Sequence, residues 1–322
     1  MTDPILPWPG EFVAVGAGEV FVRSAPALEG AESALFVHGL GGSATNWTDL
    51  MDVLRNPPED GPDGPPLACE ALDLPGFGFS PLPADGDYSL DAHAAAVCGL
   101  IEKRGYWPVH LIGNSLGGAV CVKVAARRPD LVRTLTLVSP ALPDLRPRVL
   151  PMRLSLLCAP RLGPWLLTRA QLISPVDRIS IVIRDVYADP SVVHAKRRAE
   201  EIEELIRRDG LGYAGDVLLA CARGLVAEYV RRGPRSLWHD VGRVAAPTVV
   251  MYGSHDRLVR PAMAALAARA FRNARVVVLP RIGHVAMMER PGLVANEIRW
   301  MLAATRRPAR PGPAPARAGA TR

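Results

Sequence analysis

Ser115 is the residue of this sequence best placed to act as a nucleophile. It lies in the segment Gly113-Asn114-Ser115-Leu116-Gly117, with a glycine two positions away on either side. The mainly apolar run 109–112 precedes this segment, and the mainly small and apolar run 119–126 follows it. The pattern predicts a strand, a tight turn and a helix, packed so closely that a Cβ at either glycine would clash. Such a G-x-S-x-G turn strains the serine backbone, exposes its hydroxyl, and points the amide of Leu116 toward an oxyanion formed there.

A serine hydroxyl is a weak nucleophile and needs a base, which in turn needs a group that orients it. Two downstream residues are placed to provide them. Asp256 lies in a polar turn after the apolar residues 247–252, and His284 lies in the loop that follows residues 275–279. The chain order Ser115, Asp256, His284 is an order that serine hydrolases with this turn use. The sequence therefore predicts acyl transfer to Ser115, with His284 as the base and Asp256 as the orienting acid.

Other polar residues compete for these roles. Asp144, just beyond the predicted strand 131–138, is the alternative acid. We interpret His110 as a buried histidine inside the strand before the serine, and His255 as a turn residue. The remaining candidates share a place on predicted helices and belong to no motif; they are His93, His194 and His239.

Several further segments, taken with the serine turn, resemble the α/β-hydrolase superfamily over roughly residues 10 to 303. They follow the predicted strands in the same order as in that superfamily, and they are His38-Gly39-Leu40-Gly41-Gly42-Ser43 with Asn46-Trp47, Asp73-Leu74-Pro75-Gly76-Phe77-Gly78-Phe79-Ser80, Gly253-Ser254-His255-Asp256-Arg257, and Gly283-His284. The resemblance implies an α/β fold, with a mostly parallel, twisted central sheet flanked by helices and a helical cap insertion.

The resemblance also implies roles for the first of these segments. The backbone amide of Leu40 is the candidate for the second oxyanion donor, beside that of Leu116. The imidazole of His38, followed by Gly39, is expected to brace the loop. Because the nucleophile is a serine, the haloalkane dehalogenase and epoxide hydrolase branches, which attack with aspartate, are disfavoured.

The elements needed to position these residues can be read from the same sequence. A hairpin is predicted from the two alternating runs 11–15 and 19–23, and a helix from the capping residue Ser89 to about residue 104. The other predicted elements are strands at 33–37, 67–72 and 131–138 and a helix at 46–54. Residues 1–143 and 238–304 are then the hydrolase core, 144–237 the helical cap, and 305–322 a disordered tail rich in Pro, Ala and Arg.

The cap is expected to set substrate choice without taking part in the chemistry. It contains apolar residues among arginines, which are compatible with an acyl-accepting lid or a membrane-facing surface; they include Leu156, Leu157, Trp165 and Leu166. We favour the simpler interpretation, that they form the cap's own core, and do not expect membrane contact. Residues 200–208, where Glu204 precedes Arg208 by four positions, are interpreted as an exposed, charge-laced helix.

Composition indicates a globular chain of 322 residues, 49% of them hydrophobic, long enough for one large core with a lid. The sequence has neither an apolar run of membrane-spanning length nor a secretory signal, so we expect a cytoplasmic protein. The five cysteines show no C-x-x-C pair and are interpreted as reduced thiols. Metal-ligand spacing and a dinucleotide-binding motif are both lacking, so we expect neither a metal nor a cofactor.

The net charge of +6 does not predict nucleic-acid binding. Five arginines lie in the tail, so the remainder of the chain carries about +1. The expected partner is a small, apolar acyl substrate, and the sequence does not indicate an oligomeric state.

Carboxylic ester hydrolysis through an acyl-enzyme on Ser115 is the leading functional hypothesis. One alternative is a carbon–carbon bond hydrolase of the meta-cleavage type, which the segment from Gly113 to Gly118 also resembles, although the loop after Gly39 lacks the proline common in that subfamily. The other is a non-catalytic, ligand-binding member of the fold.

Overall fold

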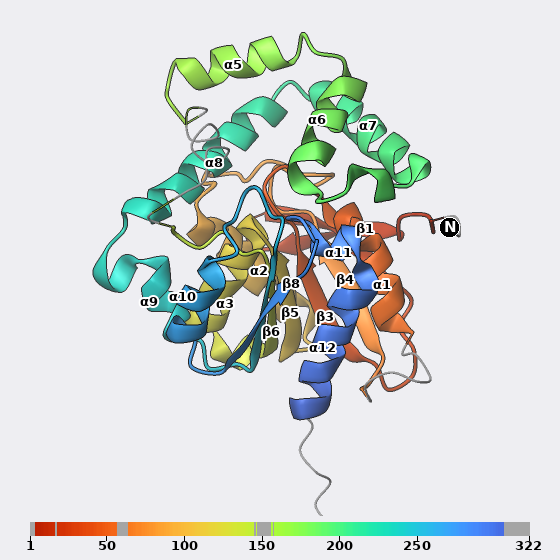
Figure 1. Cartoon of the computed structure of the whole chain (residues 1–322), viewed down its shortest axis with the longest axis vertical. Coiled ribbons are helices and arrows are strands. Elements are labelled where there is room, and N and C mark those ends of the chain that lie inside the picture. The colour runs from red at the N-terminus through yellow and green to blue at the C-terminus, as the bar shows by residue number, and fades with distance from the viewer. Residues whose placement is uncertain are drawn as a thin grey trace, which may run out of the picture.

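The computed structural model describes residues 4–16, 18–56, 64–144, 146, 156 and 158–305. Its centre is an eight-stranded sheet with the order β1-β2-β4-β3-β5-β6-β7-β8 (Figure 1). The strands are β1 (Gly10–Val15), β2 (Gly18–Ser24), β3 (Glu32–Val37), β4 (Leu67–Leu72), β5 (Val109–Asn114), β6 (Val132–Val138), β7 (Thr248–Gly253) and β8 (Ala274–Leu279). The β1–β2 and β2–β4 pairs are antiparallel, and the pairs from β4 to β8 are parallel. The predicted α/β fold with a mostly parallel sheet is confirmed, as is the hairpin at its edge.

Helices cover both faces of the sheet. They are α1 (Thr48–Arg55), α2 (Leu90–Arg104), α3 (Leu116–Arg127), α9 (Leu237–Val241), α10 (Met263–Ala270), α11 (Ala286–Glu289) and α12 (Pro291–Thr305). Alternate residues of a strand feed opposite cores: Leu35 of β3 packs with α2 and α3, and its neighbour Phe36 packs with α1 and α12. The carboxyl ends of the parallel strands are thereby held rigidly at one edge.

Helix α2 shows how local sequence sets an element's bounds. The Ser89 hydroxyl accepts a hydrogen bond from the amide of Ala92 at 3.2 Å and caps the first turn, as predicted. Gly105 ends the helix in the left-handed conformation, with a φ of 70°.

Between β6 and β7 the described chain forms helices and no strand. Before α9, these are α5 (Leu162–Ala170), α6 (Pro175–Val186), α7 (Ala195–Asp209) and α8 (Ala214–Val230), which lie over one end of the sheet at the top of Figure 1. We call residues 144–237 the insertion. The interpretation of its apolar residues as a core is wrong for Leu156 and Trp165, whose exposed fractions are 51% and 53%. Leu166 is half-buried, and Leu157 lies outside the described residues.

A buried ion cluster ties the insertion to helix α3. Lys123 of α3 is fully buried, with its Nζ 2.9 Å from Asp91 Oδ1 of α2 and 3.3 Å from Glu228 Oε1 of α8. Asp240 of α9 lies 3.7 Å from the same nitrogen. Removing one partner from such a cluster would leave an uncompensated buried charge, so it fixes where α8 and α9 meet the core.

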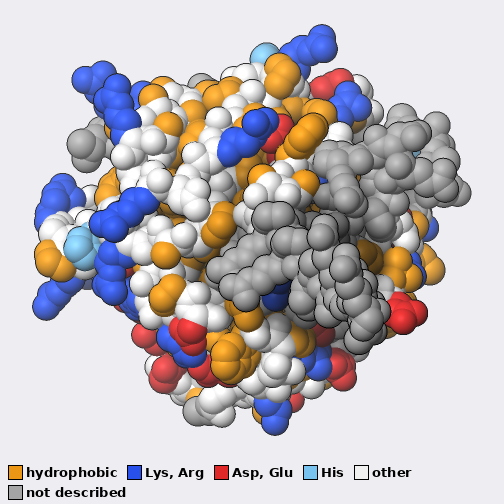
Figure 2. Space-filling view, turned by 90° about the horizontal axis from the view of Figure 1, so that it is seen from below, with side chains coloured by type: hydrophobic (Ala, Val, Ile, Leu, Met, Phe, Trp, Pro, Cys, Tyr) orange, Lys and Arg blue, Asp and Glu red, His pale blue; other side chains and the backbone are white. Residues whose placement is uncertain are grey.

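Charges on the face opposite the insertion are of both signs (Figure 2), in keeping with the small net charge expected outside the tail. Of that tail, 305–322, all but Thr305 lies outside the described residues. All five cysteines are free thiols. Within the described ranges, no helix taken singly has the length and apolarity to cross a membrane; α7 and α8 would meet that test as a pair, but with a 99° bend between them.

Candidate active site

Ser115 lies at the tight turn between β5 and α3, in the strained conformation that the sequence predicts. Its φ is 52° and its ψ is −117°, a region that non-glycine residues rarely adopt and that costs about 1–3 kcal/mol. A Cβ on Gly117 would lie 2.2 Å from the carbonyl oxygen of Val37, and one on Gly113 would lie 2.6 Å from that of Gly117. The flanking glycines are therefore required by close backbone approach, as expected.

Asp256 and His284 come together at the ends of β7 and β8. Asp256 is fully buried, and its Oδ2 lies 2.8 Å from Nδ1 of His284. Its Oδ1 accepts hydrogen bonds from the amides of Leu258 at 2.8 Å and Val259 at 2.9 Å. Burial alone would raise the pKa of Asp256, but the His284 imidazole and the Val259 amide outweigh it and hold this pKa below its usual value. The carboxylate is therefore placed to orient the imidazole through its Nδ1.

The backbone of His284 is tied to the residue before the serine. Asn114 Nδ2 donates to the His284 carbonyl at 3.2 Å and to the Val138 carbonyl at 3.0 Å. The amide of His284 donates to the carbonyl of Val186, at the end of α6, at 2.7 Å. These bonds hold the histidine loop against the serine turn and join both to the insertion.

Asp144, the alternative acid, is occupied elsewhere. Its two carboxylate oxygens accept hydrogen bonds from Arg260 at 2.6 and 2.7 Å. The structure therefore brings Asp256, and not Asp144, to the imidazole of His284.

The other histidines have structural contacts. His110 is buried, as expected, with its ring nitrogens 2.8 Å from Thr134 Oγ1 and Glu32 Oε2. His255 is an exposed turn residue, also as expected. His194 differs from the prediction: it precedes α7, and its Nδ1 accepts from the amide of Lys196 at the helix start.

The loop after β3 lies against the serine. An ideal Cβ on Gly39 would be 3.1 Å from the Cβ of Ser115 and 2.9 Å from Oδ1 of Asn114, so this backbone runs directly past the nucleophile. Leu40 comes next, and the amide of Gly42 donates to the Gly39 carbonyl at 3.1 Å to close a tight turn. This turn and the start of α3, at Leu116, flank Ser115 from two sides.

His38 braces this loop, as the resemblance implies. It is fully buried, its Nδ1 lies 2.7 Å from the Gly39 carbonyl, and its Nε2 accepts from the amide of Leu74 at 3.0 Å. Burial lowers the pKa of His38 to about 4. A neutral ring with one donating and one accepting nitrogen fits both contacts, so the loop keeps this brace at neutral pH.

Asp73 is a supporting residue that the sequence motif contained but that motif reasoning did not single out. Its Oδ1 accepts from the amide of Ala44 at 2.6 Å, and its Oδ2 accepts from the amide of Phe79 at 2.8 Å. Burial raises its pKa to about 6. A buried carboxylate that bridges two loops clamps the end of the 38–44 loop to the 73–80 loop.

Acid sensitivity of the fold should arise in part from His93, a buried residue of α2. Burial lowers its pKa to about 4, so its stabilising contribution is complete above about pH 6.5 and is lost as the pH falls toward 4. When the pH falls from 7.5 to 5, the free energy of unfolding is expected to decrease in both proteins. The decrease in His93→Phe should be smaller than that in the wild type by about 2 kcal/mol. Urea unfolding at both pH values measures this difference. His255→Gln, at an exposed position, is the control, and an unchanged pH dependence in His93→Phe would contradict the assignment.

Comparison with known proteins identifies the family. The sequence profile of the Alpha/beta hydrolase family matches residues 34–297, which is most of the chain. The chain belongs to this family. The hydrolase is 26% identical to Lipase 3 of Moraxella sp. strain TA144, over 83% of this chain and 76% of that protein.

Two other similar proteins differ in their described activities. The hydrolase is 28% identical to the 2-hydroxy-6-oxononadienedioate/2-hydroxy-6-oxononatrienedioate hydrolase of Paraburkholderia xenovorans strain LB400, over 85% of this chain and 88% of that one. The crystal structure of a membrane phospholipase A, described as a bacterial virulence factor, superposes with a TM-score of 0.72 at 22% identity, covering 92% and 86% of the two chains. This last likeness concerns the fold alone.

Proposed function

We propose that this hydrolase cleaves carboxylic esters by acyl transfer to Ser115. The observation that carries the proposal is the buried Asp256–His284 pair, held by Asn114 beside the strained turn of Ser115. This arrangement supplies a nucleophile, a base and an orienting acid, the three groups that acyl transfer to serine requires.

The reaction follows from these positions. Ser115 Oγ attacks the ester carbonyl while Nε2 of His284 takes the hydroxyl proton, and the amides of Leu40 and Leu116 bind the oxyanion. The carbon–oxygen bond to the alcohol then breaks, and His284 returns the proton to the leaving alcohol. Water, deprotonated by His284, attacks the acyl-enzyme, and the acid leaves as Ser115 recovers its proton. Asp256 stays ionised and stabilises the imidazolium in both halves.

An ester is favoured over other acyl compounds by the likeness to Lipase 3. An apolar acyl group is favoured by the apolar residues that lie over the turn beside Ser115 and over the neighbouring 73–80 loop. Leu218 of α8 has its Cδ1 3.6 Å from where a Cβ on Gly41 would be, and Val217 similarly overlies Gly76. We infer that the insertion, 144–237, is a cap on a core formed by 1–143 and 238–304.

Acyl-length preference should respond to Leu218, an apolar residue of the proposed cap that lies against the 38–42 loop. Each buried methylene contributes about 0.8 kcal/mol, or about fourfold in kcat/KM, until the pocket is full. Leu218→Ala is expected to lengthen the preferred acyl chain and Leu218→Phe to shorten it, measured with p-nitrophenyl esters of graded length. Trp165→Ala is the control, because this side chain is exposed. An unchanged preferred length in both Leu218 variants would place the acyl pocket elsewhere.

Carbon–carbon bond hydrolysis of the meta-cleavage type is the second candidate, favoured by the likeness to the P. xenovorans hydrolase. Assays of the purified protein with the ester series and with a vinylogous diketone distinguish ester hydrolysis from carbon–carbon bond hydrolysis. The proposal expects turnover of esters with kcat/KM at least about 10³ times that for the diketone, since pocket groups matched to one substrate reject another strongly. Faster diketone cleavage would overturn it.

A further inference from the structure

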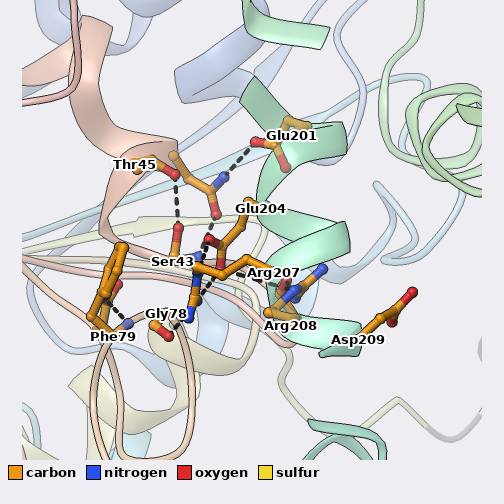
Figure 3. Close-up of polar contacts among 12 residues, drawn as sticks. Ser43, Thr45, Gly78, Phe79, Glu201, Glu204, Arg207, Arg208 and Asp209 are labelled. Carbon is orange, nitrogen blue, oxygen red and sulfur yellow. Dashed lines mark hydrogen bonds and ion pairs between the residues drawn. The ribbon is translucent and has the colours of Figure 1, made fainter. Parts of the chain in front are cut away.

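Helix α7 contacts the core through side chains of residues 200–208, a segment that the sequence predicts to be an exposed, charge-laced helix. The charge pairs within the helix are present, with Arg208 Nε 4.0 Å from Glu204 Oε1. The predicted exposure is wrong, because this side of the helix faces the core (Figure 3). Leu205 is buried, with an exposed fraction of 7%, and the side chains of Glu204 and Arg208 retain only 20% and 21% exposure. Glu204 pairs with Arg207 and Arg208 on the same helix, while Arg208 also reaches a backbone carbonyl of the core.

Two adjacent arginines of α7 bind backbone carbonyls in two different core loops. Arg208 Nη1 donates to the carbonyl of Gly41 at 2.5 Å, and Arg207 Nη2 donates to that of Gly78 at 2.5 Å. Arg207 also pairs with Glu204 at 2.7 Å, and its guanidinium lies 4.3 Å from the centroid of the Phe79 ring. A charged donor makes each carbonyl contact stronger than an ordinary hydrogen bond.

Other contacts seat the same helix beside a cavity. Asn46 Nδ2 donates to Glu201 Oε1 at 3.3 Å, and Arg197 Nη2 lies 2.5 Å from Asp49 Oδ1. A cavity of about 540 Å³ lies between α7, the 43–53 segment and the 73–79 loop. Beside this cavity, α7 meets the core through these polar contacts as well as through the buried Leu205.

The Gly41 carbonyl belongs to the turn that carries the proposed oxyanion donor. Gly41 adopts a φ of 74° at the tip of this turn, immediately after Leu40. The Gly41 carbonyl shares a peptide unit with the amide of Gly42, which donates to the Gly39 carbonyl in the peptide unit that carries the Leu40 N–H. The bond from Arg208 therefore restrains the peptide unit that supports the Leu40 amide. His38 and Asp73 hold the two ends of the loop, so Arg208 restrains the tip that they leave.

We propose that Arg208 is a positioning residue for the oxyanion hole, and that its own bond to the Gly41 carbonyl supports the rate of acyl transfer. The inference rests on the proposed function, since it assigns a role to the Leu40 amide in that reaction. The cap and the chemistry are then coupled through this bond. A movement of α7 that breaks the Arg208–Gly41 bond loosens the turn that carries the Leu40 amide. Arg208 itself contacts no reacting atom.

The test compares Arg208→Met with Arg207→Met. Methionine keeps the length of the aliphatic side chain and removes the hydrogen-bond donors. The control, Arg207→Met, loses a carbonyl bond of the same kind, the ion pair with Glu204 and the stacking on Phe79. Loss of a direct oxyanion donor costs about 10²–10³ in kcat, so partial misplacement should cost roughly 10-fold. We expect Arg208→Met to lower kcat by about this factor with KM within about twofold, and to weaken inhibition by a boronic acid, whose serine adduct mimics the oxyanion, to a similar extent. Arg207→Met should retain kcat within about twofold.

Arg208→Lys, which keeps a cationic donor, should recover most of the lost kcat, and thermal unfolding of both methionine variants shows whether either has lost its fold. Equal kcat in the two methionine variants, or a rise in KM alone, would overturn the inference and leave the ester proposal standing. Absence of ester turnover and boronic acid inhibition in the wild type would instead overturn the proposed function, and the role of Arg208 with it.

Discussion

Ser115→Ala is expected to lower kcat for ester hydrolysis by roughly 10⁶-fold while the protein keeps its fold. The reason is that the variant loses the attacking oxygen, whereas the turn that strains this residue is set by Gly113 and Gly117. Steady-state assays with a p-nitrophenyl ester measure the loss, and a fluorophosphonate probe should no longer label the variant.

His284→Ala should cost nearly as much as Ser115→Ala, because nucleophile and base work as a unit. The double variant should therefore be no slower than the slower single variant by more than a few-fold. A double variant whose loss equals the product of the two single losses would show that the residues act independently, contrary to the proposed mechanism.

Asp256→Asn is expected to lower kcat by roughly 10⁴-fold. An amide at this position would favour the wrong tautomer of His284 and would no longer stabilise the imidazolium. Asp144→Asn is the matched control: it removes the same charge from a carboxylate paired with Arg260 at 2.6 Å, away from the imidazole. A larger loss in Asp144→Asn than in Asp256→Asn would show that the acid has been misassigned.

The residues of the site that come from local patterns could be predicted from the sequence. The glycines around Ser115 predict a close approach of the backbone, because only glycine can occupy such positions. A Cβ added to Gly117 would lie 2.2 Å from a carbonyl oxygen. Placing Asp256 and His284 after successive apolar strands was sufficient to bring them together, because parallel strands end at the same edge of a sheet. Strand 33–37 and the helix after Ser89 agree with β3 and α2 within a residue or so.

Contacts between distant segments could not be predicted in this way. The Arg208–Gly41 bond joins residues 167 positions apart, and its acceptor is a backbone carbonyl that leaves no signature in the sequence. An alternation of Glu and Arg has the same appearance on a solvated helix as on one whose charges bind a core. Lys123 is a similar case, since an isolated lysine in an apolar helix does not reveal its partners Asp91 and Glu228. The cytoplasmic location stays a prediction.

Apolar composition was a poor guide within the insertion. Leucine and tryptophan in a helical segment predict a core by their transfer free energy, yet Trp165 and Leu156 are largely exposed. Trp165 instead stacks with Arg169, whose guanidinium lies 5.3 Å from its ring centroid. Short helices over a sheet edge have more surface than the core can cover, so burial there depends on docking geometry and not on residue type.

Trapping the acyl-enzyme tests the central claim most directly. The wild-type protein is mixed with a p-nitrophenyl ester, quenched in acid within milliseconds, digested and analysed by peptide mass spectrometry. We expect a burst of p-nitrophenol and an acyl group on the peptide that contains Ser115, with neither in Ser115→Ala. An acyl group on another residue, or a burst that Ser115→Ala retains, would contradict it.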